Sequence, residues 1–334
     1  MIKQNGELAA RSSHAPLKIE SIDRRQFVKG VAAVALTGYG LTPKLSLAGA
    51  GNAYDLSLSD AALAIRNGDM TSEFYTRQLL ARARNRSGLN SFITIDADSV
   101  LEAAHAADKA RAAGKVSSLL GVPVAVKDSY MTRGLATTFG TAVADGFLPK
   151  QDAAVVTSIK QAGALVFGKN NLVEMSYGLT GFNAHHGQVK NPYNPEHITG
   201  GSSSGAAASV AGRIVPAALG GDTVGSIRVP ASLCGVVGFK PTPGRWSSKG
   251  VAPISETLDT TGVLARDVAD CALMDAVVTG TPLPVQTALA GLKGVRLAYA
   301  PRQFLVGADP GVEALFWETL KKLKDAGASV IEVD

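Results

Sequence analysis

Residues 200–241 decide the fold of this chain, and they read GGSSSGAAASVAGRIVPAALGGDTVGSIRVPASLCGVVGFKP. Two turns of small residues, 200–205 and 221–226, stand in this stretch, with an Ala-rich segment at 206–211 between them. Glycine permits backbone conformations that other residues reach only with strain, so such turns mark sharp bends or a close approach to a ligand. A serine at the end of such a turn presents its hydroxyl together with several N–H groups. A nucleophile and its oxyanion hole require that arrangement.

Three further motifs precede this stretch in a fixed order: GVPVAVKD at 121–128, GKNNLVEM at 168–175 and NPYNP at 191–195. With the two serine turns, they make residues 55–334 resemble the amidase signature hydrolases. Within that family, residues 183–270 are most similar to the mandelamide and indoleacetamide hydrolases. The resemblance implies an α/β fold, the amidase-signature fold, in which a mixed central β-sheet is flanked by helices on both faces.

The resemblance also implies a catalytic relay. Ser226 would be the nucleophile, Ser202 on a cis peptide bond would pass its proton on, and Lys127 would be the terminal base. The residues themselves argue against a histidine relay, because no histidine lies in a recognisable elbow. The sequence around Ser226 also lacks the Gly-x-Ser-x-Gly pattern of α/β-hydrolases.

Lys127 can accept a proton only when its amine is neutral, whereas a free lysine has a pKa of about 10.4. Lowering that pKa to about 7 corresponds to roughly 4.6 kcal/mol, because one pKa unit is worth about 1.36 kcal/mol. Burial after the apolar strand predicted at 123–126 is the kind of setting that has this effect. The alternative is an ordinary ion pair between Lys127 and the adjacent Asp128.

The second turn would supply the oxyanion hole through the backbone N–H groups of Thr223, Val224, Gly225 and Ser226. Val224 stands where relatives most often have glycine, and Gly221 where they often have threonine. A β-branched residue adopts positive φ only with strain. Because the remaining residues of the turn match the family pattern, we expect a negative φ at Val224 and an oxyanion hole that can bind the developing negative charge.

Two weaker predictions concern the surroundings of the nucleophile. Asp222 and Arg228 bracket Ser226, and we expect them to form a pair that braces the turn. The resemblance places the substrate contacts at Met175, Ser176, Tyr177, Phe182 and Ser203. An apolar wall made by the aromatic residues would suit an aryl or alkyl amide. The alternative is that Tyr177 and Phe182 belong to the core.

No metal or organic cofactor is expected. The adjacent histidines His185 and His186 have no third ligand nearby in the sequence, and neighbouring side chains seldom face the same way. Cys234 and Cys271 lie in apolar contexts without metal-ligand spacing, so we expect buried free thiols, with a disulfide as the alternative.

The chain has 334 residues, 46% of them hydrophobic, and a net charge of +5. Residues 1–50 contain seven Lys/Arg and three Asp/Glu, a balance of +4, so the remainder carries only +1. No basic face is therefore expected on the body of the chain, which argues against a nucleic-acid partner.

Residues 1–50 resemble a twin-arginine export signal. Arg24 and Arg25 precede an apolar residue and a lysine, an uncharged run follows at 30–43, and small residues suited to cleavage stand at 48–50. The sequence therefore predicts a signal at 1–50, cleaved near Ala50, an amidase signature domain at 51–334, and a periplasmic or otherwise exported protein. The alternative is a chance Arg-Arg before an apolar helix.

Hydrophobic periodicity predicts an alternation of helices and strands. Helices are expected at 57–67, 71–84, 97–113, 154–161, 206–211, 267–278 and 311–324, and strands at 92–95, 123–126, 164–167, 295–298 and 329–333. The last strand ends one residue before the terminus, whereas relatives in the family continue further. The domain is therefore expected to be incomplete at its C-terminus.

Taken together, the sequence predicts an amidase that hydrolyses a linear carboxamide to acid and ammonia through an acyl-enzyme on Ser226. Its expected partners are a small-molecule amide and the twin-arginine export machinery, and a homodimer is left open. One rival is the amidotransferase subunit that delivers ammonia to misacylated tRNA, which the export signal argues against. The other rival is a non-catalytic protein that keeps a truncated amidase fold.

Overall fold

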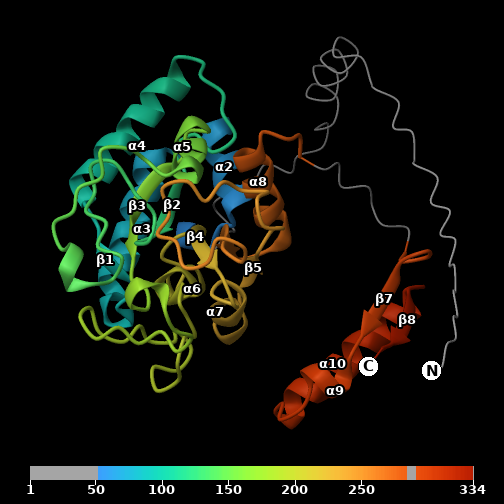
Figure 1. Ribbon diagram of the computed structural model, residues 1–334. Helices are drawn as coiled ribbons and strands as arrows, with labels where there is room; N and C mark the ends of the chain where they lie inside the picture. The colour runs from blue at the N-terminus through green and yellow to red at the C-terminus, as the bar shows by residue number, and fades with distance from the viewer. Residues whose placement is uncertain (1–51, 284–290, 334) are drawn as a thin grey trace, which may run out of the picture. The chain divides into compact units, whose positions relative to one another are not determined.

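The computed structural model describes residues 52–283 and 291–333 (Figure 1). The predicted export signal at 1–50 lies outside the described residues. Of the helices in the described ranges, none has the length and apolarity needed to cross a bilayer.

One six-stranded mixed sheet, with strand order β1-β3-β2-β4-β6-β5, forms the centre of the fold. Its strands are β1 (Phe92–Thr94), β2 (Pro123–Lys127), β3 (Leu165–Asn170), β4 (Ala217–Asp222), β5 (Val237–Phe239) and β6 (Thr260–Ala265). β2 pairs in parallel with β3 and β4, whereas the outer pairs are antiparallel. Every residue of β2 is buried, as its unbroken apolar run before Lys127 requires.

Helices pack around this sheet (Figure 1). They are α2 (Leu58–Asn67), α3 (Ser72–Asn85), α4 (Ala97–Ala112), α5 (Ala154–Gln161), α6 (Ser204–Ala211), α7 (Arg228–Leu233) and α8 (Val268–Thr279). Thr71, the predicted N-cap of α3, accepts a hydrogen bond from the N–H of Phe74. The predicted α/β fold with a mixed central sheet flanked by helices is confirmed.

α6 carries the Ala-rich segment between the two serine turns, and it packs against β2, β3 and β4. Its small side chains allow this close approach. A Cβ on Gly205 would lie 2.4 Å from the carbonyl oxygen of Ser91 and 2.5 Å from that of Asn171. Glycine is therefore required there, and the helix holds the first serine turn against the sheet.

Residues 291–333 form a βαβ arrangement: β7 (Arg296–Tyr299), the short α9 (Pro301–Phe304), α10 (Pro310–Asp325) and β8 (Ser329–Glu332). β7 and β8 pair in parallel to make a two-stranded sheet.

The predicted elements match the structure to within a few residues, with one exception. The strand predicted at 164–167 extends to Asn170 as β3. β4, β5, β6, α7 and α9 were not predicted. Glycine and other small residues interrupt the hydrophobic patterns of β4, β5, β6 and α7, and α9 is only four residues long.

Candidate active site

The site forms where two parallel strands end. β2 ends at Lys127 and β4 ends at Asp222, and the two strands are direct neighbours in the sheet. The carboxyl ends of parallel neighbours meet at one edge, where ligands commonly bind in α/β sheets. The second serine turn follows β4 directly, so the sheet brings it to the same edge as Lys127.

Lys127 contacts the first serine turn. Its Nζ donates a hydrogen bond of 2.7 Å to the Oγ of Ser202, and both side chains are buried. The peptide bond between Gly201 and Ser202 is cis, as predicted. Burial lowers the pKa of Lys127 to about 7, although the negative charges of Asp222 and Asp259 oppose this shift. A large fraction of the amine is therefore neutral near neutral pH.

The alternative role of Lys127, an ion pair with Asp128, is wrong. The carboxylate of Asp128 lies 2.9 Å from the Nζ of Lys169 on the neighbouring strand β3, with both side chains fully buried. Lys169 also donates to the carbonyl of Tyr130 at 2.8 Å and to Thr137 Oγ1 at 2.7 Å. Lys169 is thus the lysine of this edge that pairs with a carboxylate; burial lowers its pKa, and Asp128 opposes that shift. The Nζ of Lys127 contacts Ser202 instead.

The two serine turns are joined through Ser203. Its N–H donates to the carbonyl of Ser226 at 3.1 Å, and its Oγ donates to the carbonyl of Gly221 at 3.1 Å. Ser226 itself is buried. Within the described ranges, its Oγ has no hydrogen-bond partner, so the expected link to Ser202 is not a direct hydrogen bond here. The nucleophilic role of Ser226 stays a prediction.

The expected pair between Asp222 and Arg228 is present. The Asp222 carboxylate accepts bonds from the backbone N–H groups of Gly225, Ile227 and Arg228, at 2.9 to 3.3 Å. The Arg228 guanidinium adds two more, at 3.1 and 3.0 Å. Burial opposes ionisation of Asp222, but these hydrogen bonds outweigh it and lower its pKa. The turn that carries Ser226 is therefore wrapped around one carboxylate.

These hydrogen bonds show that one of the four N–H groups predicted for the oxyanion hole is wrong. The N–H of Gly225 is bonded to Asp222 and is not available to a substrate. In the part of the chain that the structure describes, the N–H groups of Thr223, Val224 and Ser226 have no acceptor. The positive φ of the turn, +131°, falls on Gly225, and Val224 has no positive φ, as expected.

A cavity of about 280 Å³ opens beside these groups. Lys127, Ser202, Asp222 and Thr223 line it, but Ser226 does not. Of the predicted substrate contacts, only Ser176 lines it; Met175, Tyr177, Phe182 and Ser203 do not. Tyr177 and Phe182 are 83% and 56% exposed, so the alternative that they are core residues is wrong.

Comparison with known proteins accords with this arrangement. A protein-family model described as Amidase matches residues 75–334. The chain belongs to the amidase family. A glutamyl-tRNA(Gln) amidotransferase subunit of Chromohalobacter salexigens is 40% identical over 293 residues, which cover 84% of this chain and 60% of that protein. This amidase-family chain thus spans about three-fifths of that relative's length.

Solved structures of amidases resemble the chain as well. A crystal structure of an amidase superposes with a TM-score of 0.77 at 34% identity, covering 84% of this chain and 63% of that one. The native peptide amidase of Stenotrophomonas maltophilia gives a TM-score of 0.75 at 32% identity, covering 84% and 62%. The amidase-signature fold is therefore shown, whereas membership of the mandelamide and indoleacetamide group stays a prediction.

Sequence reasoning missed several residues of this candidate site. The segment 251–254 supplies the apolar lining that was expected from residues 175–183. Asp259, just before β6, also lines the cavity and accepts hydrogen bonds from Thr223 Oγ1 at 2.6 Å and from the N–H of Ile254 at 2.7 Å. No local motif marks these residues, because only the pairing of β4 with β6 brings them to the site.

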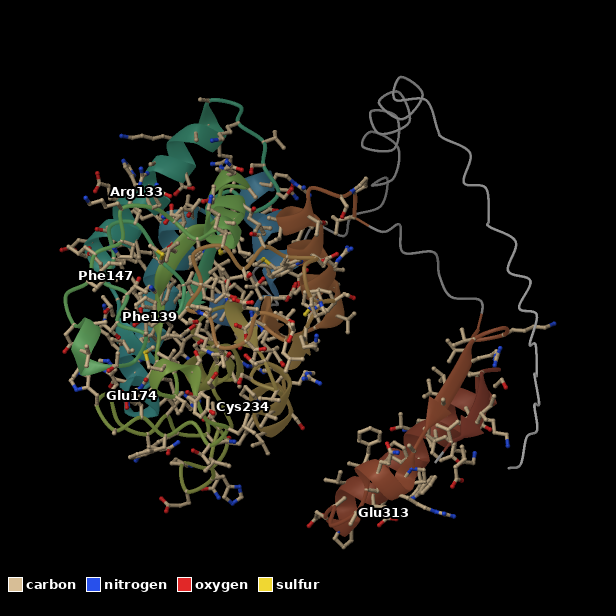
Figure 2. All side chains as sticks on the ribbon, in the orientation of Figure 1. Arg133, Phe139, Phe147, Glu174, Cys234 and Glu313 are labelled. Atoms are coloured by element: carbon tan, nitrogen blue, oxygen red, sulfur yellow. The ribbon has the colours of Figure 1, made fainter. Side chains whose placement is uncertain are left out.

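Both cysteines of this amidase-family chain are free and buried, as expected (Figure 2 labels Cys234). Burial raises the pKa of each thiol to about 12. The disulfide alternative is therefore wrong, and neither thiol is activated as a nucleophile.

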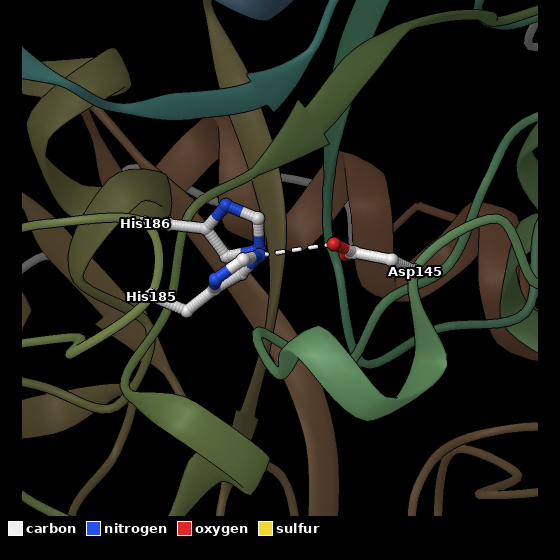
Figure 3. Close-up of side chains that lie close together, drawn as sticks. All are labelled: Asp145, His185 and His186. Carbon is white, nitrogen blue, oxygen red and sulfur yellow. Dashed lines mark hydrogen bonds and ion pairs between the residues drawn. The ribbon is translucent and has the colours of Figure 1, made fainter.

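The expectation that the side chains of His185 and His186 face apart is wrong, and a third group lies near them in space although not in the sequence. Their ring centroids lie only 4.5 Å apart, and Asp145 places a third ligand-type group beside them (Figure 3).

Proposed function

We propose that this chain hydrolyses a carboxamide to a carboxylate and ammonia through an acyl-enzyme on Ser226. The single observation that carries the proposal is the buried contact of 2.7 Å between Lys127 Nζ and Ser202 Oγ at the edge where the Ser226 turn begins. A neutral amine bonded only to a neutral hydroxyl can accept a proton, whereas a lysine paired with a carboxylate cannot.

The proposed steps give each of these residues one role. Ser226 loses its proton to Ser202 as its Oγ attacks the amide carbon, and Ser202 passes its own proton to Lys127. The free N–H groups at 223, 224 and 226 stabilise the oxyanion. The proton held by Lys127 then returns through Ser202 to the leaving nitrogen, which departs as ammonia. Water hydrolyses the acyl-enzyme by the same route and regenerates Ser226.

The lining of the cavity bears on the substrate class. Asp222, Glu256 and Asp259 give one part of it acidic character, while 251–254 is apolar. An aryl or alkyl amide, the prediction from sequence, would use only the apolar side. A polar amide that carries an ammonium group would use both.

A second candidate is the role of an ammonia-delivering amidotransferase subunit. It is favoured by the relative from Chromohalobacter salexigens, which is a glutamyl-tRNA(Gln) amidotransferase subunit with 40% identity to this chain. The comparisons and the acidic lining together support this candidate better than an aryl amidase. Export through residues 1–50 would speak against it, because a tRNA partner stays in the cytoplasm. Localisation and substrate class are therefore tested together.

The experiment is ammonia release from a panel of amides: glutamine, an amino-acid amide, a peptide C-terminal amide, indoleacetamide and mandelamide. Ser226→Ala protein serves as the blank for each amide. Release that depends on Ser226 supports hydrolysis, and a preference for glutamine supports the second candidate. A folded protein that releases no ammonia from any amide, with or without added amidotransferase partner subunits, would contradict both and favour the non-catalytic alternative.

A further inference from the structure

Three side chains of metal-ligand type gather away from the catalytic cavity: Asp145, His185 and His186 (Figure 3). One ligand atom from each lies within 4.8 Å of the others, and His185 Nε2 is 3.0 Å from Asp145 Oδ2. Among the described residues, this is the one such group of three. The relay proposed above uses none of them.

A buried asparagine explains why two adjacent histidines share one side. Asn183 Oδ1 accepts the backbone N–H groups of both His185 and His186, each at 2.8 Å. Its Nδ2 donates to the carbonyls of Gly140 at 2.8 Å and Leu172 at 2.9 Å, which fixes the amide in place. The chain between the two histidines is thus bent into a tight turn, instead of the extended form that would point them apart.

Asp145 comes from a different loop with its own supports. It follows the short 3₁₀ helix η3 (Ala142–Ala144), and its N–H donates to the carbonyl of Ala142. The N–H of Thr137 donates a hydrogen bond to the carbonyl of Phe147, which closes the loop. The rings of Phe139 and Phe147 stack with their centroids 6.0 Å apart (both are labelled in Figure 2). The carboxylate is therefore presented by an ordered loop.

The donor set selects the kind of ion. Ca²⁺ and Mg²⁺ prefer all-oxygen sites, whereas two imidazoles and one carboxylate suit Zn²⁺ and similar divalent ions. Zinc bonds of about 2.0–2.2 Å in tetrahedral geometry put ligand atoms about 3.3 Å apart. His185 Nε2 and Asp145 Oδ2, at 3.0 Å, are already near that separation, and the other ligand atoms, all within 4.8 Å, would have to move closer. Side-chain exposures of 37% for His185 and 51% for Asp145 let an ion enter and leave a position for water.

We propose that Asp145, His185 and His186 bind one Zn²⁺-type divalent ion that ties the 141–147 loop to the 183–187 turn. The ion cross-links two surface loops, because its three ligands come from two segments about forty residues apart in the chain. Phe147 of this loop stacks on Phe139, whose carbonyl accepts the N–H of Met175 at 2.8 Å, so the loop is linked to the segment that leads to Ser176 in the cavity.

The test is calorimetric titration of tag-free, EDTA-treated full-length protein with Zn²⁺, with Mg²⁺ and Ca²⁺ in parallel. One equivalent of Zn²⁺ is expected to bind and to raise the Tm, with no response to Mg²⁺ or Ca²⁺. Asp145→Asn, His185→Gln and His186→Gln should each weaken binding by at least about tenfold, the scale that loss of an outer-shell partner already reaches. Asp145→Asn keeps the side-chain shape at a half-exposed position, so of the three variants it is the one least expected to disturb folding.

A matched control removes every other histidine of the chain, as His14→Gln, His105→Gln and His197→Gln together. His105 is an informative member, because its Nδ1 lies 3.3 Å from Glu73 Oε2 in a histidine–acid pair without a third ligand in the described residues. The control should bind Zn²⁺ as the unmodified protein does. The proposal is overturned if the unmodified protein binds no Zn²⁺, or if only the control loses binding.

Discussion

Lys127 on β2 and Lys169 on β3 lie one residue out of register on neighbouring strands, yet their surroundings differ in kind. Lys169 Nζ has a carboxylate at 2.9 Å and two further oxygen acceptors. Lys127 Nζ bonds to Ser202 Oγ and, among the described residues, to nothing else. A buried ammonium with a single neutral acceptor is poorly stabilised, so the Lys127 amine loses its proton easily.

The first prediction concerns the base. Lys127→Ala should reduce kcat by about 10²–10⁴-fold, the usual cost of losing a general base. Lys127→Arg should not restore activity, because a guanidinium stays protonated. Since burial lowers the Lys127 pKa to about 7, the neutral amine is lost as pH falls, and kcat/KM should decline below about pH 7. Steady-state pH profiles measure this limb.

Lys160→Ala is the matched control, because Lys160 pairs with Asp152 and neither residue lines the cavity, so the variant should leave the profile unchanged. Ser202→Ala should resemble Lys127→Ala, and the double variant should be little worse than either, since members of one relay do not act additively. Losses that multiply in the double variant would show that the two residues act separately.

The second prediction identifies the nucleophile. A serine-directed fluorophosphonate should label the protein once, at Ser226, and Ser226→Ala should abolish the label. Ser232→Ala, on the exposed side of α7, should keep it. Intact-mass and peptide mass spectrometry count and locate the adduct. Labelling that survives in Ser226→Ala protein would assign the nucleophile elsewhere.

The third prediction concerns the carboxylate at the centre of the turn. Asp222→Ala leaves the buried N–H groups of Gly225 and Ile227 without acceptors, so it should lower the free energy of unfolding by about 3 kcal/mol. Arg228→Ala keeps those backbone bonds and removes a side chain that is 55% exposed, so it should cost about 1 kcal/mol or less. Urea denaturation measures the free energy of unfolding of both variants. Equal losses of stability in Asp222→Ala and Arg228→Ala would contradict the central role of Asp222.

The fourth prediction separates two neighbouring positions of the oxyanion turn. Gly225→Ala forces a side chain to φ +131° and brings its Cβ within 3.0 Å of Val229 Cγ2, so activity should fall and stability drop by about 1–3 kcal/mol. Val224→Ala should change both little, because Val224 is exposed and has no positive φ. Steady-state kinetics and thermal melts compare the two variants. A Gly225→Ala variant with unchanged activity and stability would contradict the strain expected at this position.

The fifth prediction concerns export. Replacing Arg24 and Arg25 together by lysine should leave the full-length precursor in the cytoplasm, because a twin-arginine signal is read through both of its arginines. Cell fractionation with an antibody against the protein measures precursor and mature forms. Unchanged export of the double-lysine variant would remove the twin-arginine interpretation and reopen the role of an amidotransferase subunit.

The sequence alone determined many of the helices and strands, although not β4, β5 and β6, and the kind of chemistry that its motifs can support. The apolar run before Lys127, the N-cap at Thr71 and the small residues of 200–226 act locally, so their strand, helix and turns are readable without a fold. The pairing of Lys127 with Ser202 was accessible only through family resemblance, since 75 positions separate the two residues.

Tertiary structure alone decided which groups became partners. Parallel pairing of β2 with β3 places the carboxylate of Asp128 beside the Nζ of Lys169. Antiparallel pairing of β4 with β6 places Asp259 in the lining of the cavity. The amide of Asn183 turned two adjacent histidines to the same side, against the expectation from their spacing. Long-range pairing and buried hydrogen bonds set these contacts, and neither leaves a periodic signal in the sequence.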